Sequence, residues 1–174
     1  EDVARRSGQG GPPRLRAPVK ITIAAVGRMK PGPEKMLVND YLNRAALAGR
    51  AQALCPFNIS EIDERKAHDR AEQSLRLAAA VPAGAAAIAL DERGETMTSP
   101  AFAKLMAAIR DRGAPEAVFL IGGADGHDRA LCERAEKVLS FGPMVWPHML
   151  VRVMLAEQLY RAVSILARSP YHRE

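Results

Sequence analysis

The sequence predicts an α/β fold in which a largely parallel sheet is covered by helices on both faces. Short apolar runs rich in β-branched residues, typical of buried strands, alternate along the chain with segments of helical periodicity. The length of 174 residues, with 48% hydrophobic and 26% charged residues, is that of one compact globular domain. This composition excludes wholesale disorder and collagen-like repeats.

Two strands and two helices are expected in the first half of the domain. Residues 20–27 form a β-branched apolar run that a glycine ends, which predicts a buried strand. Apolar side chains at i, i+3, i+4 and i+7 predict a helix over 38–49. Residues 57–62 alternate between apolar and polar side chains, as a half-buried strand does. A second helix is expected through residues 75–79, until Pro82 breaks it.

The third strand and the helix after it have distinct sequence signals. Residues 85–90 are an apolar run, so we expect a strand with Asp91 at its carboxyl end. Ser99 precedes Pro100, which predicts a helix N-cap followed by proline at the first helical position. Apolar residues then mark one face of a helix that ends before Gly113.

The C-terminal part predicts two more strands and the most apolar helix. Residues 117–121 form a strand that runs into a glycine-rich turn at 122–126. A helix over 128–137 and a short strand at 138–141 follow. Residues 148–167 predict a long helix with apolar side chains around nearly its whole circumference. Such a helix is buried on more than one side, so we expect it to contribute to a two-fold dimer interface.

Residues 1–18 differ from the rest of the chain. They lack apolar periodicity and concentrate glycine, proline and arginine, so we expect a disordered leader before a single domain over 19–174. Two alternatives stay open: a transit peptide, or an artefact of start assignment with Val19 as the true start. The leader holds four arginines and two acids of a chain with net charge +5, and the remaining surplus is weak support for a nucleic-acid partner.

Membrane and metal chemistry have no signature in this sequence. No stretch approaches the roughly 20 uncharged apolar residues that a membrane span requires. The four histidines are scattered without metal-ligand spacing, so we expect no metal site. Cys55 and Cys132 are isolated, which indicates free thiols in a reducing cytoplasm and not a disulfide framework.

Three segments are candidates for a binding site. The turn at 122–126 allows close approach of a ligand to the backbone, although a plain strand-to-helix turn is the commoner role of such a sequence. In segment 141–150, a glycine and two prolines keep backbone groups out of helix or sheet. Trp146 in that segment either contacts a ligand or anchors the core beneath the loop. The tail at 171–173 combines a ring, an imidazole and a guanidinium that can hold a nucleotide, or it is a polar end without a role.

The combination of five segments closely resembles the ribosomal RNA large subunit methyltransferase H family, the bacterial pseudouridine methyltransferases of the SPOUT class. The resemblance runs from Val19 to Glu174, and the blocks LVRVMLAEQLYRA and YHRE are its most specific parts. The five segments are KITIAAVG at 20–27, IALD at 88–91, FLIGGADG at 119–126, LSFGPMVWPHMLVRVMLAEQLYRA at 139–162 and PYHRE at the end.

The resemblance implies an enzyme that uses S-adenosylmethionine to methylate ring nitrogen N3 of a pseudouridine in helix 69 of 23S rRNA, on assembled ribosomes. It also implies a homodimer and a SPOUT-type parallel sheet, flanked by helices, whose C-terminal part is threaded into a deep trefoil knot. The cofactor contacts of the family fall, position by position, on Leu90, Gly122, Phe141, Gly142, Pro143, Met144, Val145 and Trp146.

The target base and the RNA need further residues. We expect Tyr171, His172 and Arg173 to hold and polarise the base, and Arg152 and His148 to contact RNA or the partner subunit. No residue is assigned as the general base that removes the N3 proton. Two rival functions stay open: a catalytically silent RNA-binding or ribosome-assembly module with the same fold, and a SPOUT enzyme that acts on tRNA.

Overall fold

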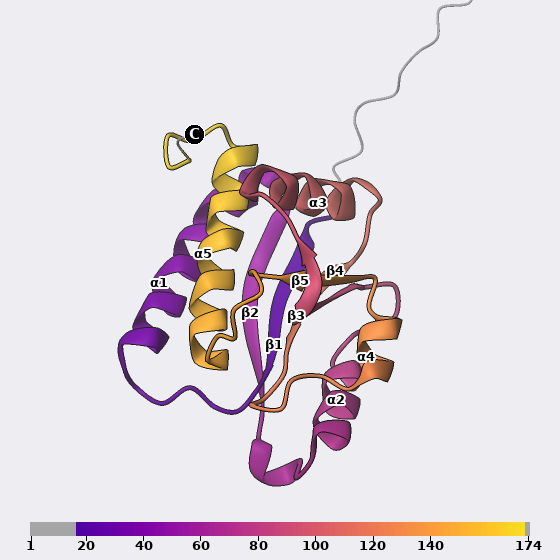
Figure 1. Cartoon of the computed structure of the whole chain (residues 1–174). Helices are drawn as coiled ribbons and strands as arrows, with labels where there is room; N and C mark the ends of the chain where they lie inside the picture. The colour runs from indigo at the N-terminus through magenta and orange to yellow at the C-terminus, as the bar shows by residue number, and fades with distance from the viewer. Residues whose placement is uncertain (1–16, 173–174) are drawn as a thin grey trace, which may run out of the picture.

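The computed structural model describes residues 17–172 (Figure 1). The predicted disordered leader therefore lies outside the described residues, except for Ala17 and Pro18, which are both exposed. Arg173 and Glu174 also lie outside the described part, so the structure says nothing of the role predicted for Arg173.

Five strands form one sheet in the order β2-β1-β4-β3-β5, and every neighbouring pair is parallel. The prediction of a parallel α/β sheet is confirmed. The two central strands are apolar runs because helices cover both of their faces: all residues of β4 are buried, as are all of β1 except Lys20. The strands are β1 (Val19–Val26), β2 (Leu54–Ile62), β3 (Ala86–Thr96), β4 (Glu116–Ile121) and β5 (Lys137–Ser140).

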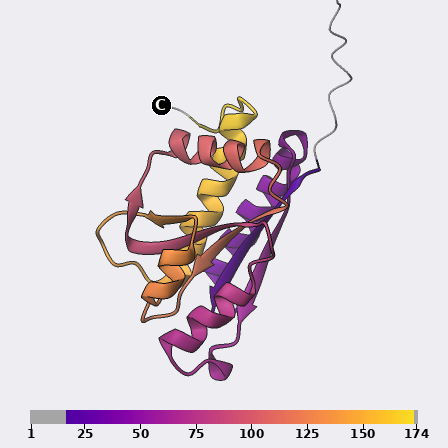
Figure 2. The ribbon, with the colours of Figure 1, turned by 90° about the vertical axis from the view of Figure 1, so that its right-hand side faces the viewer.

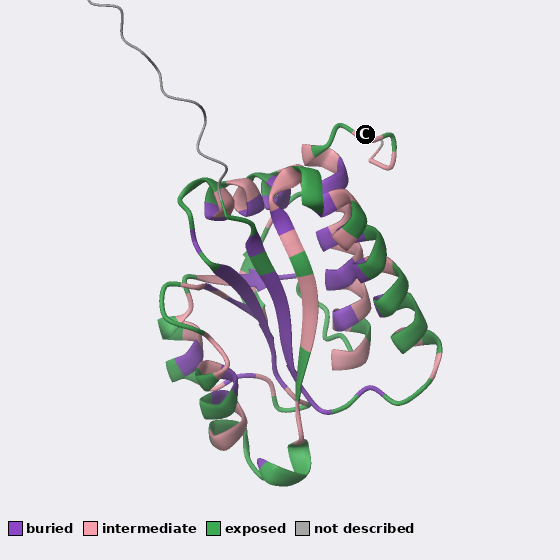
Figure 3. Ribbon diagram, turned by 180° about the vertical axis from the view of Figure 1, so that it is seen from behind, coloured by how far each residue is buried: buried purple, intermediate pink, exposed green. Residues whose placement is uncertain are grey.

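The helices form one layer on each side of the sheet (Figures 1 and 2). Three of them, α1 (Pro33–Gly49), α3 (Ser99–Asp111) and α5 (His148–Leu166), share the larger core with alternate residues of the central strands. The shorter helices α2 (Arg70–Ala79) and α4 (Arg129–Arg134) enclose a second core on the other face. Figure 3 shows the buried central strands between these two layers.

Helix α5 has the all-round apolar character that the sequence predicts. Its residues Leu155, Leu159 and Val163 are buried in the core that α5 shares with α1 and α3. Leu150, near the N-terminal end of α5, is 39% exposed. Within residues 17–172, no helix is long and apolar enough to cross a membrane.

Several element boundaries differ from the sequence prediction. The N-cap of α3 is Thr98 and not Ser99: the Thr98 side chain accepts a hydrogen bond from the Ala101 N–H at 3.3 Å. Ser99 is the first helical residue, and its hydroxyl donates to Gln158 on α5. Helix α4 ends at Arg134, earlier than predicted, because the chain then turns into β5 and the Glu136 N–H bonds to the Ala87 carbonyl. Strand β3 runs beyond its predicted end and pairs again with β5 at its last residues.

Candidate cofactor pocket

A cavity of about 330 Å³ lies where the pairing of β3 with β4 stops, at Leu90 and Ile121. Its walls come from residues 90–93 of β3, the turn after β4, and the segment between β5 and α5. This is the usual place for a ligand site in a parallel sheet, because carboxyl ends of neighbouring strands leave a crevice between their loops. The volume is that of a site for a small organic molecule.

The cavity brings together most of the residues predicted to bind the cofactor. It also contains His148, the first residue of α5. Pro143 is the one predicted cofactor residue that is not among the lining residues. The predicted residues that line the pocket are Leu90, Gly122, Phe141, Gly142, Met144, Val145 and Trp146.

The glycine-rich turn after β4 is folded tightly on itself. The Gly126 N–H donates to the Gly123 carbonyl at 3.0 Å. A Cβ atom on Gly122 would lie 2.8 Å from the backbone of Gly126, so a larger residue at this position would force the turn open. All five residues of the turn, including Ala124 and Asp125, line the pocket, so it can offer both backbone groups and side chains to a ligand.

The segment between β5 and α5 carries an exposed apolar group around the pocket. Trp146 is 39% exposed and Val145 is 81% exposed. The interpretation of Trp146 as a core anchor beneath the loop is therefore wrong, because its ring lines the cavity and is accessible to solvent. Apolar side chains gathered in the open at a cavity are typical of a surface that a ligand or another chain covers. Gly142, with φ of 110°, bends the segment in a conformation that other residues rarely adopt.

Four charged residues at the pocket, Asp91, Glu92, Arg93 and Asp125, were not assigned from the sequence. The Asp91 carboxylate, just after the apolar start of β3, accepts three hydrogen bonds from Arg93, one from its N–H and two from its guanidinium, at 2.8–2.9 Å. These bonds lower the pKa of Asp91 to about 2, so the pocket wall contains a carboxylate at neutral pH. The sequence did contain a signal for Asp91, because an acid that follows the apolar run of a parallel strand is well placed to contact a ligand.

The histidine beneath the pocket is part of the core. His127 is 2% exposed, and its Nε2 lies 3.0 Å from the Leu120 carbonyl oxygen. Burial lowers its pKa, so the imidazole is neutral at pH 7. His148, in the pocket wall, also has a lowered pKa, because it is partly buried and lies near the Arg152 guanidinium.

Arg152 has a different role from the one predicted. Its side chain is fully buried, and its guanidinium donates to the Glu61 carboxylate at 3.0 Å and to the Val26 and Gly27 carbonyls. A buried guanidinium needs such acceptors to offset the loss of water. The prediction that Arg152 contacts RNA or the partner subunit is therefore corrected: it ties the ends of β1 and β2 to α5 inside the molecule.

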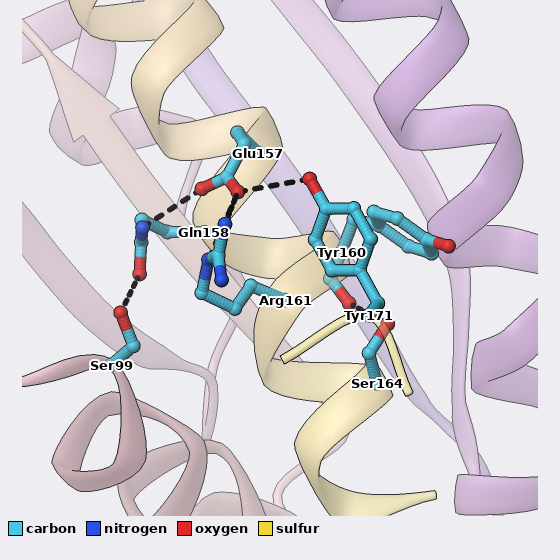
Figure 4. A network of polar contacts seen from close by, with 7 residues as sticks. All are labelled: Ser99, Glu157, Gln158, Tyr160, Arg161, Ser164 and Tyr171. Atoms are coloured by element: carbon cyan, nitrogen blue, oxygen red, sulfur yellow. Dashed lines mark hydrogen bonds and ion pairs between the residues drawn. The ribbon is translucent and has the colours of Figure 1, made fainter. Parts of the chain in front are cut away.

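Tyr171, the first residue of the tail, packs against α5 (Figure 4) and does not line the pocket of its own chain. The Tyr171 hydroxyl donates to Glu157 Oε1 at 3.1 Å, and its ring centroid lies 4.4 Å from that of Tyr160. Glu157 follows His148 by nine residues on α5, which corresponds to about 14 Å along the helix axis. The two ring nitrogens of His172 are buried and have no hydrogen-bond partner among the described residues.

A second cavity, of about 580 Å³, forms an apolar groove between α1, α3 and α5. We call it the helix groove. It is lined by Leu37, Tyr41, Phe102, Val153 and Met154, among others, and Glu157 lies in its wall. Three residues, Leu139, Phe141 and Gly142, line both the helix groove and the pocket. Within residues 17–172, no cluster of acidic, histidine or cysteine side chains could hold a metal ion.

The sequence from residue 19 to residue 172 matches a family model described as "Predicted SPOUT methyltransferase". Together with the parallel sheet and the cavity at its carboxyl edge, this match defines the class. The chain belongs to the SPOUT methyltransferase family.

Three similar proteins share one name, Ribosomal RNA large subunit methyltransferase H. The protein of Dinoroseobacter shibae is 56% identical over 155 residues, which is 89% of this chain and 99% of that protein. Those of Maricaulis maris and Paracoccus denitrificans are 54% and 52% identical over 156 residues, or 90% of this chain and 100% of each protein. The resemblance that the sequence segments indicate is thereby confirmed.

Among solved structures, the SpoU methyltransferase AviRb from Streptomyces viridochromogenes, in complex with AdoMet, aligns with a TM-score of 0.42 and 16% identity. The alignment covers 88% of this chain and 62% of that one.

Proposed function

We propose that this protein transfers a methyl group from S-adenosylmethionine to ring nitrogen N3 of a pseudouridine in helix 69 of 23S rRNA, on assembled ribosomes. The observation that carries the proposal is the pocket, in which seven residues from three distant segments surround one cavity at the positions implied for the cofactor. The name shared by the relatives supports ribosomal RNA as the substrate. Such a substrate implies action in the cytoplasm.

The residues of the pocket suit S-adenosylmethionine chemically. Leu90, Phe141 and Trp146 offer apolar surface to a purine ring, and the backbone groups of the turn at 122–126 can bind its edge. The Asp91 carboxylate is suited to accept hydrogen bonds from hydroxyl or ammonium groups. When bound, the cofactor supplies a methyl group on a positively charged sulfur.

The protein contributes to catalysis mainly by positioning the two reactants. The acceptor N3 must lose its proton and lie in line with the methyl group, and holding two reactants in this way lowers the barrier substantially. We assign the tail residues Tyr171, His172 and Arg173 to hold and polarise the base. The unpartnered ring nitrogens of His172 support this assignment, because a buried imidazole without partners has hydrogen bonds left to make.

The tail can reach a pocket only through a second copy of the chain. Within one chain, Tyr171 is bonded to the middle of α5 and does not line the pocket. We therefore propose a two-fold homodimer in which the partner covers the helix groove. In a two-fold interface the same patch lies on both sides. This patch contains Glu157, to which the tail is bonded, and Phe141, which also lines the pocket. In the proposed dimer the tail of one subunit therefore lies beside the pocket of the other.

Two structural expectations accompany the proposal. Residues 19–174 act as one SPOUT methyltransferase domain, and the deep trefoil knot in its C-terminal part stays a prediction from the resemblance.

The decisive experiment uses ribosomes from a strain that lacks the corresponding gene. Incubation with the purified protein and S-adenosylmethionine should add one methyl group to the helix 69 fragment, as measured by mass spectrometry of nuclease digests. An unmethylated fragment together with methylated tRNA would contradict the proposal in favour of a tRNA enzyme. If no RNA is methylated and calorimetric titration detects no cofactor binding, the protein is a silent binding module.

A further inference from the structure

We propose that Glu157 is a positioning residue whose carboxylate fixes the C-terminal tail in the place from which it contacts the target base. The proposal rests on the role of the tail given above. It concerns a residue that touches neither the pocket of its own chain nor the cofactor, and that acts through Tyr171.

The two oxygens of the Glu157 carboxylate accept hydrogen bonds from four donor groups (Figure 4). Oε1 accepts from the Tyr171 hydroxyl at 3.1 Å and from the Arg161 guanidinium at 2.9 and 2.5 Å. Oε2 accepts from the Gln158 amide at 2.8 Å. The carboxylate therefore has a fixed orientation toward the tail.

The same network is tied to a second helix. The Gln158 amide oxygen accepts a hydrogen bond of 2.8 Å from the hydroxyl of Ser99, the first residue of α3. Tyr171 is thus anchored through Glu157 and Gln158 to two helices of the main core, α5 and α3. Side chains whose rotamers are locked by such bonds hold a functional group within a fraction of an ångström.

Tyr171 is held by its ring as well as by its hydroxyl. The ring packs against Tyr160, and the Arg161 guanidinium carbon lies 4.9 Å from its centroid, a cation–π contact. Burial and the bond to Glu157 raise the pKa of Tyr171 to about 12, so its hydroxyl stays protonated and remains a donor at physiological pH.

The position of Glu157 places its hydrogen bond with Tyr171 next to the proposed dimer interface. Glu157 lies in the wall of the helix groove, which also includes residues shared with the pocket. When a second copy covers the groove, the carboxylate lies at the boundary between the two chains. Correct placement of the tail then requires that this one side chain keep its bonds.

Methylation by four variants tests the role of Glu157. E157L removes the acceptors and should lower kcat by roughly 10- to 100-fold while the Kd for S-adenosylmethionine stays within about twofold. E157Q keeps an oxygen for the Tyr171 hydroxyl and should restore much of the rate. Y171F should lower kcat as well, and the double variant E157L/Y171F should lose little more than the worse single variant, because both changes break one interaction.

The matched control is E133L, which breaks an exposed i,i+4 ion pair with Arg129 on α4 and should leave kcat unchanged. Sedimentation velocity of each variant reports whether the dimer persists. If E157L is poorly folded, E157Q and Y171F still decide the matter by the same readouts.

Wild-type kcat in E157L, or losses in E157L and Y171F that simply add, would overturn the role of Glu157. A variant that lacks residues 171–174 separates this outcome from failure of the proposed function. If that deletion abolishes methylation but E157L does not, only the anchor is disproved. If the deletion leaves methylation unchanged, the role of the tail itself is disproved.

Discussion

The Arg152 guanidinium on α5 donates a hydrogen bond of 3.0 Å to the carboxylate of Glu61 on β2, across 91 positions of sequence. Glu61 Oε1 also accepts from the Met29 N–H at 2.8 Å, in the loop that follows β1. One ion pair, between a fully buried guanidinium and a carboxylate whose side chain is 27% exposed, therefore joins β2 to the helix that begins directly after the pocket segment. Together with the bonds to the Val26 and Gly27 carbonyls, it helps to fix the start of α5 beside the pocket.

Replacement of Arg152 by methionine should destabilise the fold by about 3–5 kcal/mol. The change leaves the Val26 and Gly27 carbonyls and the Glu61 carboxylate without their buried donor. Denaturant unfolding measures the loss. The control is R65M, because Arg65 is 80% exposed in its ion pair with Asp63, and solvent screens such a pair, so this change should alter stability little. Equal effects of the two substitutions would show that burial of the Arg152 guanidinium does not strengthen its contacts.

Stability should fall as the pH decreases below about 6.5, in part because of His127. Burial lowers its pKa in the folded state from the ordinary value of 6.5, so the unfolded chain takes up a proton at a higher pH than the folded one. The contribution is complete above pH 6.5 and is lost as the pH falls, by at most about 1.4 kcal/mol per pH unit for one group.

Unfolding of H127N between pH 5 and 8 should accordingly show a shallower dependence on pH than unfolding of the wild type. The control is H68N, which changes an exposed histidine. A wild-type slope in H127N would mean that His127 takes up its proton equally in both states.

Truncation of Trp146 to alanine should weaken binding of S-adenosylmethionine by roughly tenfold, which corresponds to about 1.4 kcal/mol. The ring lines the pocket but is 39% exposed, so the melting temperature should change little. Isothermal titration calorimetry and thermal unfolding separate the two effects. L75A, which truncates a side chain 63% exposed on α2, is the control for loss of an exposed apolar group. Unaltered affinity in W146A would place the cofactor elsewhere.

Deletion of residues 171–174 should abolish methylation and leave cofactor affinity nearly intact. The tail makes its described contacts with the middle of α5, and none of its described residues lines the pocket of the same chain. Single-turnover methylation of ribosomes, alongside calorimetry with S-adenosylmethionine, gives both quantities. Loss of cofactor binding in the deletion variant would show that the tail supports the pocket and not the target base.

Local periodicity was sufficient to predict the elements of this fold, because buried parallel strands and amphipathic helices have different repeats. Local periodicity could not predict which distant segments contact one another. Arg152 in an apolar helix pattern looks like a surface cation, and only the packing of α5 over β1 and β2 makes it a buried donor. The cap at Thr98 was missed by one position, since the Ser-Pro pair beside it fits the same rule.

For the pocket too, local sequence patterns identified single segments but not how those segments pack together. Periodicity and spacing alone left the turn at 122–126 and the segment at 141–150 as separate weak candidates. The resemblance joined them, and the strand order explains why: β3 lies between β4 and β5, so the turn after β4 and the segment after β5 both lie beside residues 90–93 of β3. The anchor of Tyr171 on Glu157 lay beyond sequence reasoning, since it depends on the tail folding back along α5.

Leu139, Phe141 and Gly142 face the pocket on one side and the helix groove on the other. A ligand that shifts Phe141 in the pocket also changes the shape offered to whatever fills the groove. Thermodynamic reciprocity then requires that the occupant of the groove alter the affinity for that ligand by the same factor. We therefore expect that, in the proposed dimer, self-association and binding of S-adenosylmethionine are coupled equilibria, and each can be followed by titrating the other.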